Sequence, residues 1–128
     1  MGPWYGPGAT ARDGRQDGHM DDDASRIEIE RHPDDRGGGR YQLLVDGREA
    51  GELDYREVEG RRAFTHTGVR EAYEGRGLAG RLARRVLDDA RAEGVAVVPL
   101  CPYVAAYLDR HPDDADLVDQ DLTARLRR

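Results

Sequence analysis

Apolar and polar residues alternate in short runs over the first half of the chain, and this pattern predicts a series of strands. Two residue pairs that favour tight turns, Asp46-Gly47 and Glu59-Gly60, separate neighbouring runs. An Asp-Gly pair between two alternating runs is a strong hairpin signal. We therefore predict antiparallel strands that follow one another along one sheet. They are expected around Ile27 and Ile29 and over residues 41–45, 49–57 and 62–69, with a loop over residues 34–39.

A long amphipathic helix is predicted from Leu78 to Gly94. Its apolar positions recur every three or four residues and form one stripe, while the opposite face is charged. Gly94 supplies the stop, because glycine enters the left-handed cap conformation without penalty. The apolar run 95–100 then predicts a buried strand. The strand 62–69, the helix and the strand 95–100 together form a βαβ unit.

The turn Gly75-Arg76-Gly77 lies between the first strand of this unit and its helix. Backbone N–H groups at a helix start, with the positive end of the helix dipole behind them, favour a bound phosphate. With Gly80 the segment is a literal G-x-G-x-x-G, the pattern of dinucleotide sites. However, the strand before it is polar, and no acidic residue follows the next strand to hold a ribose. The glycines therefore fit a diphosphate better than a whole NAD molecule, which stays open as an alternative.

The segment from Val69 through Tyr73 to Ala79 resembles the acetyl-CoA motif of the GCN5-related N-acetyltransferases. In that superfamily a Gln/Arg-x-x-Gly-x-Gly/Ala turn binds the pyrophosphate of coenzyme A. Gly77 and Ala79 match its two small positions, whereas Glu74 stands where Gln or Arg is expected. This departure should cost little, because main-chain N–H groups hold the phosphates. A carboxylate beside a diphosphate is still unfavourable, so we expect Glu74 to point to solvent.

A second stretch strengthens the resemblance. The pair His66-Thr-Gly-Val69 and Cys101-Pro-Tyr103-Val is similar to the signature of a small, single-domain branch of the same superfamily. The resemblance implies an α/β (α+β) fold with a mixed, mostly antiparallel sheet flanked by helices. It covers residues 26–118, after a disordered tail at 1–25 and before a C-terminal extension at 119–128.

The resemblance also implies acetyl-CoA as co-substrate and direct acetyl transfer to a primary amine, of a small molecule or a peptide. The strand end at Val69 and Arg70 is expected to pair with the pantetheine arm, and the glycine turn to surround the diphosphate. The cofactor-binding residues are thus expected to be Val69, Arg70, Gly75, Arg76, Gly77, Leu78, Ala79, Gly80 and Arg81.

Three side chains are candidates for catalysis. His66 is the candidate general base, because an unperturbed imidazole has a pKa of about 6.5 and so exchanges a proton near neutral pH. Cys101 ends the strand 95–100, where it either accepts the acetyl group or lines the pocket. Tyr107 matches the helix tyrosine that protonates the departing sulfur in many relatives. Each also has a structural alternative: His66 packs beside Phe64, Cys101 is an inert core thiol, and Tyr107 is a core aromatic.

Composition excludes several other classes of function. The net charge is −6, all 20 basic residues are arginine, and no long basic block is present, which makes nucleic-acid binding a poor fit. No apolar run approaches the ~20 residues of a membrane span, and we expect a cytoplasmic protein. No metal is expected, because the histidines lack ligand spacing and the acidic cluster at 113–116 is interpreted as a solvated loop. The rival of another class is a non-catalytic acyl-CoA-binding module, since so short a chain leaves little protein for a substrate pocket.

Overall fold

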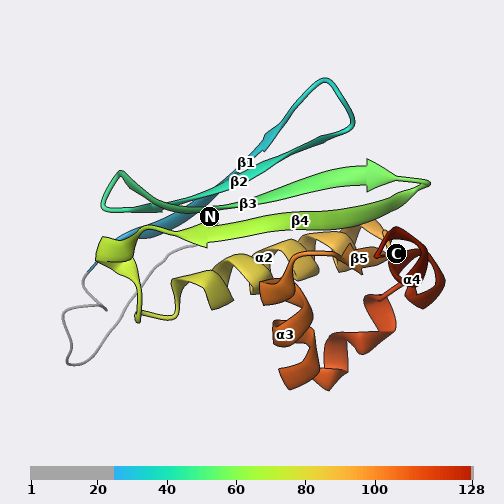
Figure 1. Cartoon of the computed structure of the whole chain (residues 1–128). Coiled ribbons are helices and arrows are strands. Elements are labelled where there is room, and N and C mark those ends of the chain that lie inside the picture. The colour runs from blue at the N-terminus through green and yellow to red at the C-terminus, as the bar shows by residue number, and fades with distance from the viewer. Residues whose placement is uncertain (1–24, 128) are drawn as a thin grey trace.

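Five strands form one mixed sheet in the order β1-β2-β3-β4-β5 (Figure 1). In this computed structural model, which describes residues 25–127, neighbouring strands from β1 to β4 are antiparallel. Only the last pairing, β4 with β5, is parallel. The mixed, mostly antiparallel sheet predicted from the sequence is confirmed. The strands are β1 (Ile27–Pro33), β2 (Gly38–Val45), β3 (Arg48–Val58), β4 (Arg61–Val69) and β5 (Val97–Pro99). Apart from Ser25, the predicted tail at 1–25 lies outside the described residues.

Both predicted hairpin turns have the backbone conformation that their residues favour. Asp46 and Gly47 have φ values of 51° and 83°, and Glu59 and Gly60 have values of 51° and 77°. Two consecutive residues with positive φ are the mark of the tight turns whose twist matches that of the flanking strands. These turns set β2 against β3 and β3 against β4.

The predicted loop at 34–39 is too long, because β2 already begins at Gly38. A Cβ atom on Gly38 would lie 2.5 Å from the carbonyl oxygen of Tyr55, and one on Gly39 would lie 2.6 Å from that of His32. These two glycines are therefore required by close strand contact rather than by a turn. Such a requirement depends on strands that are distant in sequence.

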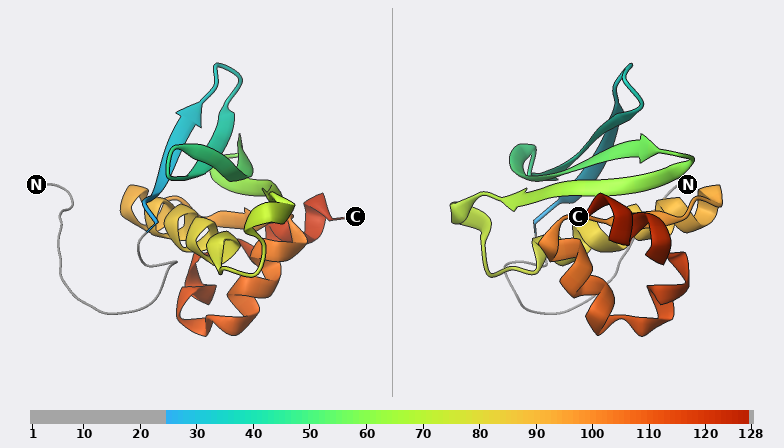
Figure 2. Two further views of the ribbon diagram at one scale, coloured as in Figure 1. Left: turned by 90° about the vertical axis from the view of Figure 1, so that its left-hand side faces the viewer. Right: turned by 45° about the vertical axis from the view of Figure 1, so that its right-hand side comes forward.

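Helix α2 (Leu78–Glu93) covers one face of the sheet, and the helices that follow it gather around β5 (Figures 1 and 2). The predicted long helix, α2, packs its apolar stripe against the inward side chains of β2, β3 and β4, among them Tyr41, Leu53 and Phe64. The 3-10 helix η1 (Glu71–Tyr73) precedes it. After β5 come α3 (Pro102–Arg110), η2 (Pro112–Leu117) and α4 (Gln120–Leu126).

The C-terminal extension folds onto the domain through α4. The Asp119 carboxylate caps this helix by accepting a hydrogen bond from the Leu122 N–H at 2.9 Å. Leu122 packs against Ala63 and Val98 in a small second cluster. Since Ala63 alternates with Arg62 and Phe64, which face α2, α4 lies over the opposite face of the sheet.

The acidic segment 113–116 is part of the 3-10 helix η2, and its acids are exposed as expected except Asp114, which is only 6% exposed. Its carboxylate accepts two hydrogen bonds from Arg84 of α2, at 2.7 and 3.0 Å. These bonds hold the pKa of Asp114 below its usual range against the opposing effect of burial. The segment thus fastens η2 to α2.

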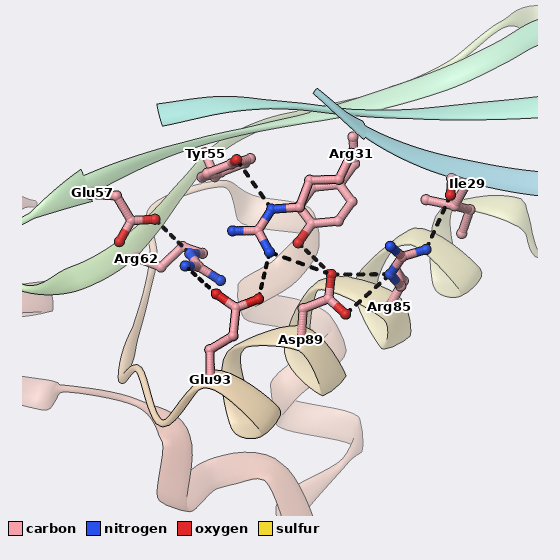
Figure 3. Close-up of polar contacts among 9 residues, drawn as sticks. Ile29, Arg31, Tyr55, Glu57, Arg62, Arg85, Asp89 and Glu93 are labelled. Atoms are coloured by element: carbon pink, nitrogen blue, oxygen red, sulfur yellow. Dashed lines mark hydrogen bonds and ion pairs between the residues drawn. The ribbon is translucent and has the colours of Figure 1, made fainter. Parts of the chain in front are cut away.

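The C-terminal end of α2 is held to the sheet by a charged layer (Figure 3). The two carboxylate oxygens of Glu93 accept hydrogen bonds from Arg31 of β1 and from Arg62 of β4. Arg62 is buried and also donates to Glu57 at 2.6 Å. Hydrogen bonds from Arg31 and then Arg62 lower the pKa of Glu93, which keeps this residue ionised. The layer fixes the C-terminal end of α2 far from its glycine-rich start.

Candidate active site

Strands β4 and β5 separate halfway along β4. Their pairing covers only Arg62–Phe64 of β4, and the Cys101 N–H then donates to the Phe64 carbonyl at 2.8 Å. Beyond that point β4 runs on to Val69, and no described strand pairs with it on the β5 side. The two strands therefore leave an opening at the end of β4.

Main-chain groups of β4 face this opening. The Arg70 N–H is bonded to the Ala50 carbonyl of β3 at 2.7 Å, so it points away from β5. Backbone groups alternate between the two sides of a strand, which directs those of Val69 and Thr67 to the β5 side. An extended ligand can pair with these groups as a strand would.

A cleft of about 350 Å³ occupies the opening. It runs from the end of β4 to the first turn of α2, with the first turn of α3 as its other wall. Of the predicted cofactor residues it contacts Val69, Gly75, Gly77, Leu78 and Ala79. The full lining is Thr67, Gly68, Val69, Tyr73, Glu74, Gly75, Gly77, Leu78, Ala79 and Tyr103.

The glycine turn shapes the end of the cleft beside α2. Gly75 and Gly77 have φ values of 82° and 74°, in the left-handed region that favours glycine. Gly77 is also the N-cap of α2, and in the described chain this helix start has neither a side-chain cap nor an acidic residue in its first turn. The first N–H groups of α2 are thus left for an anion, at the positive end of the helix dipole.

The other predicted cofactor residues lie around this turn. Glu74 is exposed but contacts the cleft. Arg76 stacks on Tyr73, with 5.7 Å from its guanidinium carbon to the ring centroid. Arg81 is exposed on α2 one turn later, whereas Gly80 faces α3, because a Cβ there would lie 3.7 Å from the Tyr103 hydroxyl.

Arg70 does not line the cleft. Its guanidinium donates to Glu52 at 2.6 Å and pairs with Glu49 at 3.0 Å, on the sheet face that α2 leaves uncovered. His66 lies on the same face, with its side chain 52% exposed and its Nε2 atom 2.9 Å from the Glu52 carboxylate. It does not pack beside Phe64, which points to the opposite face and into the core.

Cys101 is buried where α3 begins, as the N-cap of that helix. Its thiol donates to the Thr67 hydroxyl at 3.2 Å, and Thr67 lines the cleft. The sulfur therefore lies at the point where β4 and β5 separate, beside a helix start whose dipole favours negative charge. His66 precedes Thr67 by one residue on β4, but its side chain lies on the other face of the sheet.

The two tyrosines of α3 have different surroundings. Tyr107 is 7% exposed and stacks on His111, with ring centroids 3.9 Å apart. The His111 Nδ1–H donates to the Tyr107 carbonyl at 2.8 Å, so His111 ends the helix and serves the structure. Tyr103, one turn earlier, lines the cleft.

Glu52 and Thr67 are site neighbours that sequence reasoning did not select, and it favoured Tyr107 over Tyr103. Thr67 and Tyr103 lie within the quoted motifs His66-Thr-Gly-Val69 and Cys101-Pro-Tyr103-Val, so the signal for both is present there. For Glu52 the only signal is a carboxylate in the middle of a predicted strand. Within residues 25–127 no group of three His, Cys, Asp or Glu side chains could hold a metal ion. No helix in that same part of the chain is long and apolar enough to cross a membrane.

Comparison with known proteins addresses the same region. The family model described as GCN5-related N-acetyl-transferase matches residues 40–117, which run from β2 to the end of η2 and contain the whole cleft. No curated protein matches the chain.

Solved structures resemble the fold. An IAA acetyltransferase from Bacillus cereus ATCC 14579 aligns with a TM-score of 0.51 and 18% identity, over 58% of this chain and 65% of its own length. A ribosomal-protein-alanine N-acetyltransferase from Brucella melitensis biovar Abortus 2308 aligns with a TM-score of 0.48 and 23% identity, over 66% and 63% of the two chains. The chain thus spans about 65% and 63% of the lengths of these two proteins.

Proposed function

The chain belongs to the GCN5-related N-acetyltransferase family, and we propose that it transfers the acetyl group of acetyl-CoA directly to a primary amine. One observation carries the proposal: a cleft joins the uncapped start of α2 to the end of β4, with which no described strand pairs on the β5 side. A cofactor with a diphosphate at one end and a thioester at the other fits such a cleft.

We propose that the diphosphate binds the first turn of α2 and the loop before it. Its holders are the N–H groups of Gly77, Leu78 and Ala79, with Gly75 supplying the turn. The open space beside both glycines supports this assignment, since no described atom lies within 4 Å of a Cβ built on either one. Gly80, Arg76 and Arg81 stay at the periphery of the proposed site.

The pantetheine arm is proposed to run along the free side of β4. Val69 and Thr67 offer main-chain groups there, and the thioester would then lie near the thiol of Cys101. Pairing of this kind needs no side-chain recognition, which agrees with the small residues Thr67, Gly68 and Val69 that line the cleft from β4. Arg70 is left with a role on the other face of the sheet.

Transfer requires three events at the thioester. The amine nitrogen must lose a proton and attack the carbonyl carbon, the carbonyl oxygen must be stabilised, and the carbon–sulfur bond must break with protonation of the thiolate. We propose His66, directly or through a water molecule, as the base, and β4 N–H groups as the stabilising donors. Cys101, Tyr107 and the cleft-lining Tyr103 are the candidates near the sulfur.

Calorimetric titration with acetyl-CoA, CoA and NAD tests the cofactor, and thiol release over a panel of small amines and peptides tests the reaction. Micromolar binding of acetyl-CoA, none of NAD and thiol release with an amine are expected. If CoA binds but no amine of the panel leads to thiol release, the non-catalytic acyl-CoA-binding module would be favoured instead. NAD binding in place of acetyl-CoA would favour a dinucleotide site. We propose a cytoplasmic location because acetyl-CoA is available there.

A further inference from the structure

A buried carboxylate lies directly behind the proposed base. Glu52 sits in the middle of β3 and is only 8% exposed, although charged residues are almost never so buried unless they are paired. Its cross-strand neighbour on β4 is Gly68, two residues after His66. No step of the reaction described above uses Glu52, so its burial calls for an explanation.

Both oxygens of Glu52 have partners. Oε2 lies 2.9 Å from His66 Nε2, and Oε1 accepts from Arg70 Nη1 at 2.6 Å. Burial opposes ionisation of this carboxyl, but the hydrogen bonds from Arg70 and His66 outweigh it and hold its pKa below the usual range. Glu52 is therefore a carboxylate at neutral pH.

An ionised carboxylate only accepts hydrogen bonds, so the bonded nitrogen of His66 must carry the hydrogen. With hydrogen on Nε2, a neutral imidazole has its lone pair on Nδ1. We propose that Glu52 is a positioning residue for His66: it fixes the Nε2–H tautomer and makes Nδ1 the atom that accepts the proton from the amine or from an intervening water. This inference rests on the proposed acetyl transfer for its catalytic part, whereas the tautomer stands on the geometry alone.

Gly68 provides an independent observation. A Cβ atom at this position would lie 2.8 Å from Glu52 Oε2 and 3.3 Å from His66 Nε2, so any side chain would push the pair apart. Glu52 of β3 and His66 of β4 can therefore contact each other only because residue 68 has no side chain. Gly68 also lines the cleft, which places the pair directly behind the proposed thioester site.

The remaining charges near His66 are largely paired with one another. Asp54 is its Cα partner on β3, and Arg40 of β2 binds Asp54 through two hydrogen bonds of 2.6 and 3.1 Å. Arg70 is shared between Glu52 and Glu49. Glu52 is the carboxylate that bonds the imidazole itself, so its charge favours the imidazolium that forms when His66 takes a proton.

The test compares Glu52→Gln, Gly68→Ala and Asp54→Asn with the unchanged protein. Asp54→Asn removes the same charge from the same strand but leaves the bond to Nε2 intact, so it is the matched control. Gly68→Ala keeps every charged group and only displaces the pair. It therefore tests the pair even if Glu52→Gln fails to fold. Circular dichroism checks the fold of each.

Two readouts are made, and the first does not need turnover. Nitrogen NMR of the His66 imidazole is expected to show the Nε2–H tautomer in the unchanged protein and in Asp54→Asn. In Glu52→Gln the preference for this tautomer should weaken, because the group that accepts from Nε2–H is no longer an ionised carboxylate. Gly68→Ala should lose the tautomer preference.

The second readout is kcat and the KM for acetyl-CoA in the thiol-release assay. In Glu52→Gln, kcat should be about 10-fold lower with the KM for acetyl-CoA unchanged. An Nδ1–H tautomer in the unchanged protein, or a tautomer preference and a kcat that do not respond to Glu52→Gln, would overturn the proposal. If NMR shows the predicted tautomer but no amine of the panel supports thiol release, the proposed function is overturned and, with it, the role of Nδ1 as base.

Discussion

Gly77→Glu is the sharpest perturbation of the proposed diphosphate site. Gly77 has a φ of 74° and caps α2, and no described atom lies within 4 Å of a Cβ built on it. A glutamate therefore has room, but its backbone is strained by about 1–2 kcal/mol in the left-handed region. The variant is expected to fold with that loss of stability, and to carry a carboxylate at the mouth of the cleft.

The effect on binding follows from Coulomb's law. Two unit charges ~6 Å apart at an effective dielectric constant of ~20 repel by about 3 kcal/mol. Because the cleft is open to solvent, screening reduces this repulsion, and we expect a net penalty of about 1.4–2.8 kcal/mol. That penalty corresponds to an affinity about 10- to 100-fold weaker.

Gly60→Glu is the matched control. Gly60 has a φ of 77°, equally open surroundings and a place in the β3–β4 turn, away from the cleft. Calorimetry with acetyl-CoA should show the loss only in Gly77→Glu, and added salt should reduce it, while denaturant unfolding should show similar destabilisation in both variants. Equal affinities for the two variants would refute the phosphate assignment.

The remaining predictions concern the sulfur end of the cleft and the attachment of η2. Because Tyr103 lines the cleft and Tyr107 stacks on His111, Tyr103→Phe should lower kcat more than Tyr107→Phe in a thiol-release assay; the reverse order would contradict this and restore Tyr107 as the donor. Cys101→Ala should lower kcat less than about 10-fold if the thiol lines the pocket, whereas complete loss of turnover with intact CoA binding would indicate an acetyl-cysteine intermediate. Asp114→Asn should cost about 1–3 kcal/mol at pH 7, because it weakens two charged hydrogen bonds. The pKa of Asp114 is lowered in the folded state, so its stabilisation is present above the unfolded value of ~3.9 and is lost as pH falls through the folded one; a pH-independent difference in urea unfolding would be the contrary result.

Features set by neighbours in the chain could be predicted from the sequence. The Asp46-Gly47 and Glu59-Gly60 turns, the long helix and its glycine-rich start all follow from local backbone preference and helical periodicity. They were enough to predict the order of strands and the βαβ unit. The motif resemblance added the family, which the match over residues 40–117 shows.

Contacts between distant segments could not be predicted in this way. Gly38 and Gly39 looked like loop residues because the sequence does not state how closely two strands approach. Asp114 looked like a solvated acid because its partner Arg84 is 30 residues away, on another helix. In each case the deciding atom belongs to another element.

The arrangement of the candidate site divides along the same line. The chain itself determined that a phosphate-binding turn, a histidine and a cysteine occur in one βαβ unit, because motif spacing is a property of the sequence. The tertiary structure decided that His66 faces Glu52 rather than Phe64, and that Tyr103 rather than Tyr107 lines the cleft. Strand register and helix rotation select those faces, and both are set by packing across the whole domain.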